Sequence, residues 1–475
     1  MAVQAPPIRL SEVLAALSSA LDLAEGQPAG HAVRTGLIGM RLADELALDA
    51  AARSALFYAL LLANAGGPGT AGEVTALLDG DDRALKAGFA TVDWTQAVAA
   101  ARYGLRHAGE GRPVWSRTRA VVRTAGSVAR VARTFISGRA ERGAAVARRL
   151  GLPEATAEAI RSADEQWDGR GHPIGMRGEA IPLLARIVGL ARTVDVFATA
   201  GGPAEAVRMA RARRGKWFDP ALAERVTAWA GDELWWSGLR GSAAAARLAA
   251  AEPRDRIRMV DDAGLDEIAR AFAGIVDSKR PWTAGHSARV GALSASIGAA
   301  LGADAEGRRR LLRAGLLHDI GELSVANRAL DESDALTPAE FTEIKQHSLQ
   351  TYEILAKLPP FAGFARLAAL HHERLDGSGY PWGLSGDEIG AEARVLAVAE
   401  VYDALTLWRP YRSAMTPQEA LMLMRSDAGL DPAVITALEE HLGAEARAGG
   451  DLPAGASGHD AINADPATGH EPTTG

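Results

Sequence analysis

Apolar side chains recur at three- to four-residue spacing along the C-terminal half of the chain, which is the spacing of one buried helix face. The clearest case is the segment 286–301, whose apolar positions are Val290, Leu293, Ile297 and Leu301. Residues 308–318 (RRRLLRAGLLH) predict a second helix, ending before Gly321. Segments that alternate apolar and polar residues, as half-buried strands do, are scarce. The pattern therefore predicts an all-α protein.

Turn signals separate the predicted helices. Thr337-Pro338-Ala339-Glu340 predicts a helix start, since it offers a capping hydroxyl, a proline at the first helical position and a glutamate at the third. Residues 376–386 are rich in turn formers and follow a predicted helix over 367–373. We therefore expect a surface loop over 376–386.

The chain contains its own pattern twice. The segment that begins at Glu165 aligns without a gap with the segment that begins at Glu373, at an offset of 208 residues. The matched pairs include Asp168 with Asp376, Pro173 with Pro381 and Asp195 with Asp403. Further out, His31 matches His286, and Phe218-Asp219-Pro220 matches Leu430-Asp431-Pro432. A repeat of this length indicates tandem modules.

The repeat and the composition together divide the chain. We expect a first module over 1–235, a linker or connecting helix over 236–253, and a second module over 254–444. Residues 445–475 are rich in Gly, Ala, Pro, Asp and Thr and have almost no large apolar side chains, which predicts a disordered tail.

Composition excludes some classes of protein. The 475 residues include no cysteine, so any metal must be held by nitrogen and oxygen ligands. The start of the chain lacks a signal-peptide pattern and the apolar run 56–63 is too short to span a bilayer. We therefore expect a cytoplasmic protein that is not inserted in a membrane.

One segment is unusually basic. Residues 102–149 carry 12 arginines against Glu110 and Glu141, although the whole chain has a net charge of −7. Solvated helix faces explain such a segment, whereas a nucleic-acid site would need interleaved aromatic residues, and few are present. We expect no nucleic-acid partner.

Histidines and carboxylates are concentrated in the second module. Five of the 11 histidines fall between residues 286 and 372, Asp319 follows one of them directly, and Glu400 lies within the apolar run VLAVAEVYDAL. An unpaired carboxylate on a buried helix face is costly, and a metal ion would remove that cost. The five histidines are His286, His318, His347, His371 and His372.

This ligand set suits two metal ions. Adjacent residues on a helix point about 100° apart, so each member of the His371-His372 pair can serve a different ion. The Asp319 carboxylate has two oxygens and can bridge. Two such ions lower the pKa of a water that then attacks a phosphate ester, and they neutralise phosphoryl charge. The prediction is a phosphohydrolase in which His318 and Asp319 are central to catalysis.

The same residues resemble a known family. Module two is similar to the HD-GYP subfamily of HD-domain metal phosphohydrolases over essentially all of residues 275–444. The matching motifs are His286-Ser-Ala-Arg-Val290, Leu316-Leu-His-Asp-Ile-Gly321, Lys345-Gln-His347, His371-His-Glu-Arg-Leu-Asp-Gly-Ser-Gly-Tyr-Pro381, Tyr402-Asp-Ala-Leu-Thr406 and Arg409-Pro-Tyr-Arg412.

The resemblance implies an all-helical fold and hydrolysis of cyclic di-GMP to pGpG or GMP. It implies that two divalent transition-metal ions, iron or manganese, are held by His286, His318, Asp319, His347, His371, His372 and Glu400. It places Gly379, Tyr380 and Pro381 in a loop beside the substrate, and Arg409 and Arg412 at its phosphates. It also implies that Asp403 hydrogen-bonds a metal ligand.

Three positions depart from the family pattern. Glu400 stands where the family has Asp, and Glu322 replaces a lysine that contacts substrate phosphate, so we expect repulsion of a phosphodiester. Trp282 stands where three-metal members have Glu, which favours a two-metal site.

Module one resembles the same fold without its metal ligands. Of the seven ligand positions it retains His31, while the others hold Asn64, Ala65, Arg139, Ala163, Asp164 and Arg192. The loop residues Asp168, Gly169, Gly171 and Pro173 remain. The loop is kept either for its backbone geometry or because module one senses a ligand or mediates dimerisation.

Three functions stay open at this point. The first is a cyclic di-GMP phosphodiesterase, and the second is an HD-type phosphohydrolase of another nucleotide or phosphate ester. The third is a signalling or scaffold protein that uses the domain for ligand binding. The partners to expect are a cyclic dinucleotide or another phosphodiester, and a second copy of the chain or a signalling protein.

Overall fold

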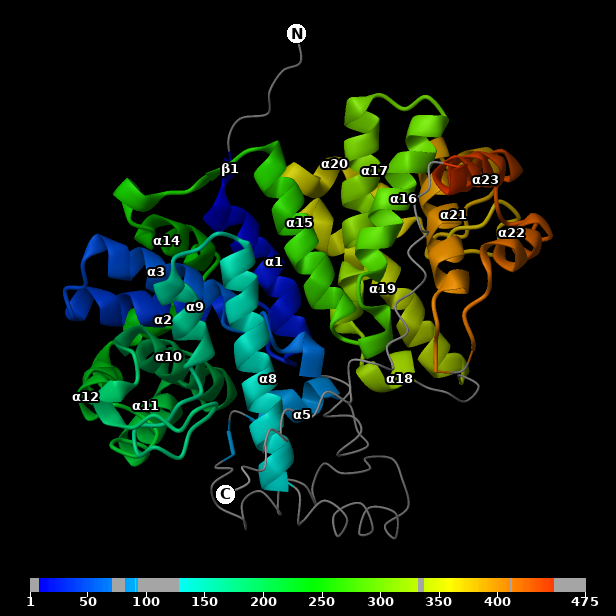
Figure 1. Cartoon of the computed structure of the whole chain (residues 1–475). Helices are drawn as coiled ribbons and strands as arrows, with labels where there is room; N and C mark the ends of the chain where they lie inside the picture. Colours follow the sequence, from blue (N-terminus) through cyan, green and yellow to red (C-terminus); the bar gives the residue numbers. More distant parts are fainter. Residues whose placement is uncertain are drawn as a thin grey trace, which may run out of the picture.

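The computed structural model describes residues 8–70, 82–89, 91–92, 128–331, 337–410 and 412–447, and most of these residues are helical (Figure 1). The all-α prediction is confirmed. The predicted disordered tail lies outside the described residues beyond Arg447, and so does the basic segment between 102 and 127. Among the described residues, no helix is long and apolar enough to cross a membrane.

The N-terminal half begins with a two-residue strand and continues as helices. Its elements are β1 (Ile8–Arg9), α1 (Leu10–Ala24), α2 (His31–Glu45), α3 (Ala50–Leu62), η1 (Pro68–Thr70), α5 (Asp82–Phe89), α8 (Val128–Arg149), α9 (Glu154–Arg161), η2 (Gly178–Ala180), α10 (Leu183–Gly201), α11 (Pro203–Ala212), α12 (Pro220–Ala228), η3 (Trp229–Gly231), α13 (Glu233–Gly238) and α14 (Ala244–Ala251).

The C-terminal half repeats this order. Its elements are η4 (Arg254–Arg256), β2 (Met259–Val260), α15 (Asp262–Asp277), η5 (Pro281–Thr283), α16 (His286–Ala300), α17 (Ala305–Leu317), η6 (Ile320–Ser324), α18 (Asn327–Asp331), α19 (Pro338–Ala356), α20 (Pro359–Ala369), η7 (Gly386–Glu388), α21 (Ala391–Thr406), α22 (Pro417–Arg425) and α23 (Pro432–Arg447).

Side-chain caps fix several helix starts. The Thr337 hydroxyl accepts a hydrogen bond from the Glu340 amide and the Glu340 carboxylate accepts one from the Thr337 amide, which is the predicted capping box of α19. Asp49 caps α3 by accepting from the Ala52 amide at 2.8 Å. Asp304 caps α17 in the same way, accepting from Gly307 at 2.7 Å. The repeat seen in the sequence therefore extends to the helix caps.

Equivalent helices occupy equivalent places in the two halves. At the sequence offsets of the repeat, α1, α2, α3, α8, α9 and α10 correspond to α15, α16, α17, α19, α20 and α21. In each half the helix that begins with histidine, α2 or α16, packs on the next helix and on the last of the set, α10 or α21. The two halves are two copies of one helical bundle.

The segment between the copies is built into the first one. Its helix α14 packs on α2, and the Leu248 side chain fills the space over Gly36. Just after α14, the buried Glu252 carboxylate accepts hydrogen bonds from Ser11 and Tyr58, both at 2.7 Å. Of the two expectations for 236–253, the connecting helix describes it better than a linker.

A continuous core joins the two copies. One cluster of buried apolar side chains runs from Leu14 in α1 to Leu396 in α21, and α1 packs against η6 and α19 of the second copy. Strand β1 pairs antiparallel with β2, with Ile8 opposite Val260. The modules therefore share buried apolar surface.

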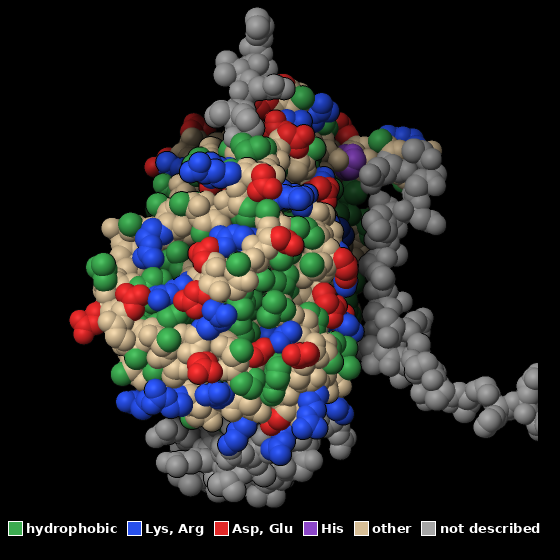
Figure 2. All heavy atoms as spheres, turned by 90° about the vertical axis from the view of Figure 1, so that its left-hand side faces the viewer, with side chains coloured by type: hydrophobic (Ala, Val, Ile, Leu, Met, Phe, Trp, Pro, Cys, Tyr) green, Lys and Arg blue, Asp and Glu red, His purple; other side chains and the backbone are tan. Residues whose placement is uncertain are grey.

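The outer face of the first copy is chemically mixed. Figure 2 shows basic and acidic side chains interspersed with small apolar areas over the part that is described. Acidic and basic side chains alternate over most of that face, and basic side chains gather along its lower edge (Figure 2).

Candidate metal centre

Two trios of potential ligand atoms lie together in the C-terminal module. The first is His286, His318 and Glu400, and the second is His347, His371 and His372; within each trio the ligand atoms lie within 4.8 Å of one another. They come from the start of α16, the end of α17, the middle of α21, the middle of α19 and the turn after α20. Residues from 286 to 400 thus converge on one buried point.

Asp319 lies between the trios and turns one oxygen to each. Its Oδ2 is 3.2 Å from His318 Nε2 and 3.8 Å from His286 Nε2. Its Oδ1 is 3.4 Å from His347 Nε2 and 3.5 Å from His371 Nε2. This is the arrangement of a bridging carboxylate, and the structure thus brings all seven predicted ligands together.

The histidines whose Nε2 atoms lie near the carboxylates are oriented through Nδ1, the second ring nitrogen. His286 Nδ1 lies 2.7 Å from Asp403 Oδ2, so Asp403 takes the orienting position that the resemblance implied. His318, His347 and His371 each place Nδ1 within 2.6–2.7 Å of the carbonyl oxygen three residues earlier. A proton on Nδ1 leaves the Nε2 lone pair free to bind a cation.

The two adjacent ligand pairs lie at helix ends and not within helices. Helix α17 ends at Leu317, and α20 ends at Ala369, earlier than the predicted helix over 367–373. His318-Asp319 and His371-His372 therefore occupy the turns that follow. Carbonyls in a last helical turn lack amide partners, and His318 and His371 satisfy one each. The geometry assumed for two residues within one helix was wrong. The assignment of His371 and His372 to different ions was wrong too, because the ligand atoms of both belong to one trio.

Burial and charge set the pKa values in the cluster. Burial disfavours the charged form of His286, but the Glu400 and Asp403 carboxylates outweigh it and raise its pKa to about 10. Burial, together with positive charge on His318 and His347, lowers the pKa of His371 to about 3. Burial also disfavours ionised Glu400, yet His286 and His318 hold its pKa well below the usual range. The carboxylates are thus ionised and His371 is neutral at pH 7.

The donor set fits divalent cations. His318 Nε2 and Glu400 Oε2 are buried 3.2 Å apart, and neither has a partner of good hydrogen-bond geometry among the described residues. Such atoms are costly unless something binds them. Imidazole and carboxylate ligands are typical of iron, manganese and zinc sites.

The predicted substrate loop folds over the second trio. The Tyr380 ring lies 4.7 Å from the His372 ring. The buried Glu373 carboxylate holds the loop by accepting from the amides of Trp382 at 2.7 Å and Leu384 at 2.9 Å. A Cβ at Gly379 would lie 2.4 Å from the backbone nitrogen of Arg374, so the loop requires glycine there. Pro381 follows in a cis peptide bond.

The predicted arginines line an open pocket beside the ligands. Arg409 and Arg412 border it together with His372 and Glu400. Arg412 also donates to the carbonyls of Ala404 at 2.6 Å and Leu405 at 2.8 Å, so it caps the end of α21. Two cations near the ligands escaped the sequence analysis, Arg374 in this pocket and Lys345, whose Nζ lies 5.2 Å from the Tyr380 ring centre. Both belong to matched motifs, which was the available signal.

Glu322 does not present an uncompensated negative charge. Both of its oxygens accept from Arg280 Nη2, at 2.5 and 2.7 Å, in a mostly buried ion pair. The expected repulsion of a phosphodiester is therefore weaker than the sequence indicated. The buried Lys279 ammonium holds the same turn by donating to the Glu322 carbonyl at 2.6 Å.

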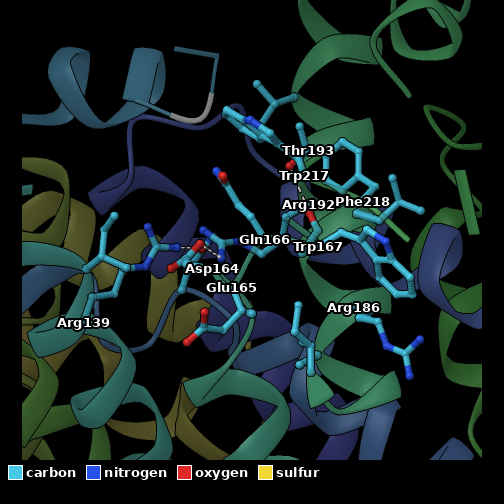
Figure 3. A pocket seen from close by; sticks show the side chains of 18 of the residues that line it. Arg139, Asp164, Glu165, Gln166, Trp167, Arg186, Arg192, Thr193, Trp217 and Phe218 are labelled. Carbon is cyan, nitrogen blue, oxygen red and sulfur yellow. Dashed lines mark hydrogen bonds and ion pairs between the residues drawn. The ribbon is translucent and has the colours of Figure 1, made fainter. Parts of the chain in front are cut away.

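The first copy keeps the orienting groups and replaces the ligands. His31 Nδ1 lies 2.7 Å from Asp195, as His286 does from Asp403. At the former ligand positions Arg139 donates to Asn64 at 3.1 Å. Arg192 donates to Asp164 at 3.2 Å, and both of these residues are labelled in Figure 3. The guanidinium groups of Arg139 and Arg192 thus place positive charge of the protein itself where the second module would hold metal ions.

Comparison with known proteins agrees with this geometry. The model of the HD domain family matches residues 118–222 and 270–434. The protein named 3'3'-cGAMP-specific phosphodiesterase 3, from Vibrio cholerae serotype O1, is 38% identical over 444 residues, 93% of this chain and 96% of that protein. The chain belongs to the HD domain family. The HD-GYP resemblance of its second module is confirmed.

Two further relatives of this HD protein differ in how much they share with it. A crystal structure described as a cyclic GMP-AMP specific phosphodiesterase of V. cholerae covers 92% of this chain and 98% of its own, with 34% identity and a TM-score of 0.61. The cyclic di-GMP phosphodiesterase response regulator RpfG of Xanthomonas campestris pv. campestris is 36% identical over 178 residues, 37% of this chain and 46% of that protein.

Proposed function

We propose that this HD protein is a metal-dependent phosphodiesterase of cyclic dinucleotides, and that its second module, about 254–444, performs the hydrolysis while the first, about 1–235, does not. The observation that carries the proposal is the pair of ligand trios sharing Asp319. An arrangement of this kind suits two ions working on one phosphate.

Each trio would hold one cation. His286, His318 and Glu400 would hold the first, His347, His371 and His372 the second, and Asp319 both. Iron or manganese suits these ligands. When bound, such ions neutralise phosphoryl charge and lower the pKa of a water that serves as nucleophile. Glu400 already reaches the two histidines of its trio, at 3.1 and 3.2 Å, so the longer side chain fits.

The other residues of the site bind and orient the substrate. Arg374, Arg409 and Arg412 border the pocket beside His372 and offer donors to a phosphodiester. The Tyr380 ring lies against His372 of the second trio, with ring centres 4.7 Å apart. Lys345, near Tyr380, supplies a cation that can stand in for the family lysine replaced by Glu322.

The full-length relative decides which cyclic dinucleotide to test first. The protein that shares both modules is named for 3'3'-cGAMP, whereas RpfG, named for cyclic di-GMP, aligns over 178 residues, about the length of one module. We therefore propose 3'3'-cGAMP as the first substrate and cyclic di-GMP as the second.

Product analysis tests the proposal. The full chain, reconstituted with Mn(II) or Fe(II), is incubated with each cyclic dinucleotide, and linear products are separated by chromatography. We expect linear dinucleotide or mononucleotide, and no turnover by a chain carrying His318→Ala and Asp319→Ala. Asn64→Ala, at the equivalent position of the first module, is the matched control and should remain active. Turnover by the double variant would place the chemistry elsewhere.

Glu322 keeps a second function open. If neither cyclic dinucleotide is cut while a nitrophenyl phosphodiester is, the site is an HD phosphohydrolase of another phosphate ester. If metal binds and no ester is cut, the chain is a binding or scaffold protein that could act through a second copy or a signalling partner.

A further inference from the structure

The first module contains a cavity where the second holds its metal ligands. The cavity has a volume of about 120 Å³ and is lined by Asn64, Arg139, Asp164 and Arg192, which stand at former ligand positions. A space of this size holds on the order of ten water molecules. At roughly 30 Å³ of liquid volume per water, this is a space comparable to a small ligand such as a mononucleotide.

One end of the cavity is cationic. Lys86, Arg139 and Arg192 lie there together with the carboxylates of Glu25 and Asp164. Glu25 pairs with both Arg139, at 3.2 Å, and Lys86, at 3.8 Å. The third acid nearby, Glu165, is turned to the loop and accepts from backbone amides, including Met176 at 2.9 Å.

The two arginines lie close enough to disturb each other. Burial lowers the pKa of Arg192, and the positive charge of Arg139 lowers it further, while Asp164 acts in the opposite direction. The side chains of both arginines are at least 86% buried. Like charges held together in this way are stabilised by a bound anion, and guanidinium groups match phosphate geometry.

The other end of the cavity is aromatic. Trp167, Trp217 and Phe218 line it. In Figure 3 Arg139 and Asp164 lie on one side of the pocket, and Trp167 and Phe218 lie on the other. Arg186 lies over the Trp167 ring at 5.6 Å and forms an ion pair with Asp219 at 2.6 Å. Aromatic side chains of this kind stack on nucleobases.

We propose that this cavity binds a nucleoside monophosphate, with the phosphate at Arg139 and Arg192 and the base against the tryptophans. The site would be a binding site without hydrolysis, since arginines occupy the ligand positions. A nucleoside monophosphate is a different ligand from the cyclic dinucleotide proposed for the second module. The inference does not depend on that proposed function.

Binding is measured on the full chain with the second site disabled by His318→Ala and Asp319→Ala. Isothermal titration with GMP should show one saturable site, with weaker binding of guanosine and of inorganic phosphate. Adding Arg139→Gln or Arg192→Gln should weaken GMP binding on the order of tenfold or more, because charged hydrogen bonds are lost. Arg208→Gln, an exposed arginine of the same module, is the matched control and should bind as its parent does.

Trp167→Ala separates the two ends of the cavity. It should weaken GMP binding on the order of tenfold and leave phosphate binding unchanged. This variant also keeps the test decisive if an arginine variant fails to fold, as checked by circular dichroism. The proposal is overturned if GMP does not bind the disabled chain, if the Arg139 variant binds GMP like the control, or if cyclic dinucleotide binds there and GMP does not.

Discussion

At the scale of single residues, the two modules share one device for holding a histidine. His31 and His286 each place Nδ1 2.7 Å from an aspartate, Asp195 or Asp403, that is also held by an arginine at 2.7 Å. In the second module the device aims Nε2 at Glu400 and Asp319. In the first module the same histidine–aspartate–arginine arrangement persists beside Arg139 and Arg192, so this arrangement does not require a metal.

This duplication gives a matched pair of variants. Asp403→Ala should weaken Mn(II) binding roughly 10- to 100-fold, because His286 loses the partner that fixes its tautomer and ring orientation. Asp195→Ala removes the same group from the first module and should leave Mn(II) affinity unchanged. Chelator competition on the two purified chains measures the difference. Equal affinities would show that Asp403 does not orient a ligand.

Residue types, spacing and the family resemblance named seven candidate ligands from the sequence, and the structure places these side chains close together. The Glu322–Arg280 pair could not be predicted, since its partners lie 42 positions apart and approach only after folding. The end of the helix before His371 was also missed, because α20 ends at Ala369 and the predicted helix continued to 373. Apolar periodicity continues past that end although the regular hydrogen bonding does not.

At the scale of elements, the loop after α9 and the loop after α20 are each held by a buried glutamate of their own. Glu165 accepts from the amides of Ile174 and Met176, and Glu373 accepts from those of Trp382 and Leu384. The glycines Gly171 and Gly379 both lie too close to backbone for a Cβ. The loop of the first module therefore has the same kind of backbone contacts as the loop of the second.

Removing that glutamate should affect activity in the second module alone. Glu373→Ala releases the loop and displaces Tyr380 from His372, so we expect a fall in kcat/KM of roughly 10- to 100-fold. Glu165→Ala should release the other loop and leave kcat/KM unchanged. Steady-state hydrolysis of the cyclic dinucleotide measures both. A normal kcat/KM for Glu373→Ala would mean that the loop does not position substrate.

A buried aspartate joins α1 to α2 and predicts a pH dependence of stability. Asp22 accepts from the Ala32 amide at 3.2 Å, and burial raises its pKa from 3.8 to about 6. The folded protein therefore binds a proton there more tightly than the unfolded chain. Its contribution is complete below pH 3.8 and is lost as pH rises through about 6.

Asp22→Asn should therefore stabilise the protein at pH 8, on the order of 2–3 kcal/mol, and have little effect near pH 4. Urea unfolding at the two pH values measures the difference. Asp44→Asn, on an exposed aspartate, is the control and should show no such pH-dependent gain. A gain by Asp22→Asn that is equal at both pH values would contradict the assigned pKa.

At the scale of the whole molecule, the two copies form one body with different chemistry. The shared core and the packing of α1 on η6 bring the first module against the turn that follows Asp319. Helix α5 contacts both modules, because Lys86 lines the first module's cavity while Arg83 donates to the Ser324 carbonyl and to Glu343 of the second module. The repeat predicted two modules, but their packing depends on apolar faces that carry no signature of their partner.

We propose that the second module holds two metal ions and the first module none. The most direct test of this proposal is the metal content of the full chain after reconstitution with Mn(II), measured by plasma mass spectrometry against protein concentration. We predict two ions per chain in the unaltered protein and a loss of both in the His318→Ala, Asp319→Ala chain. One ion or none in the unaltered protein, or two ions retained by the double variant, would contradict the account.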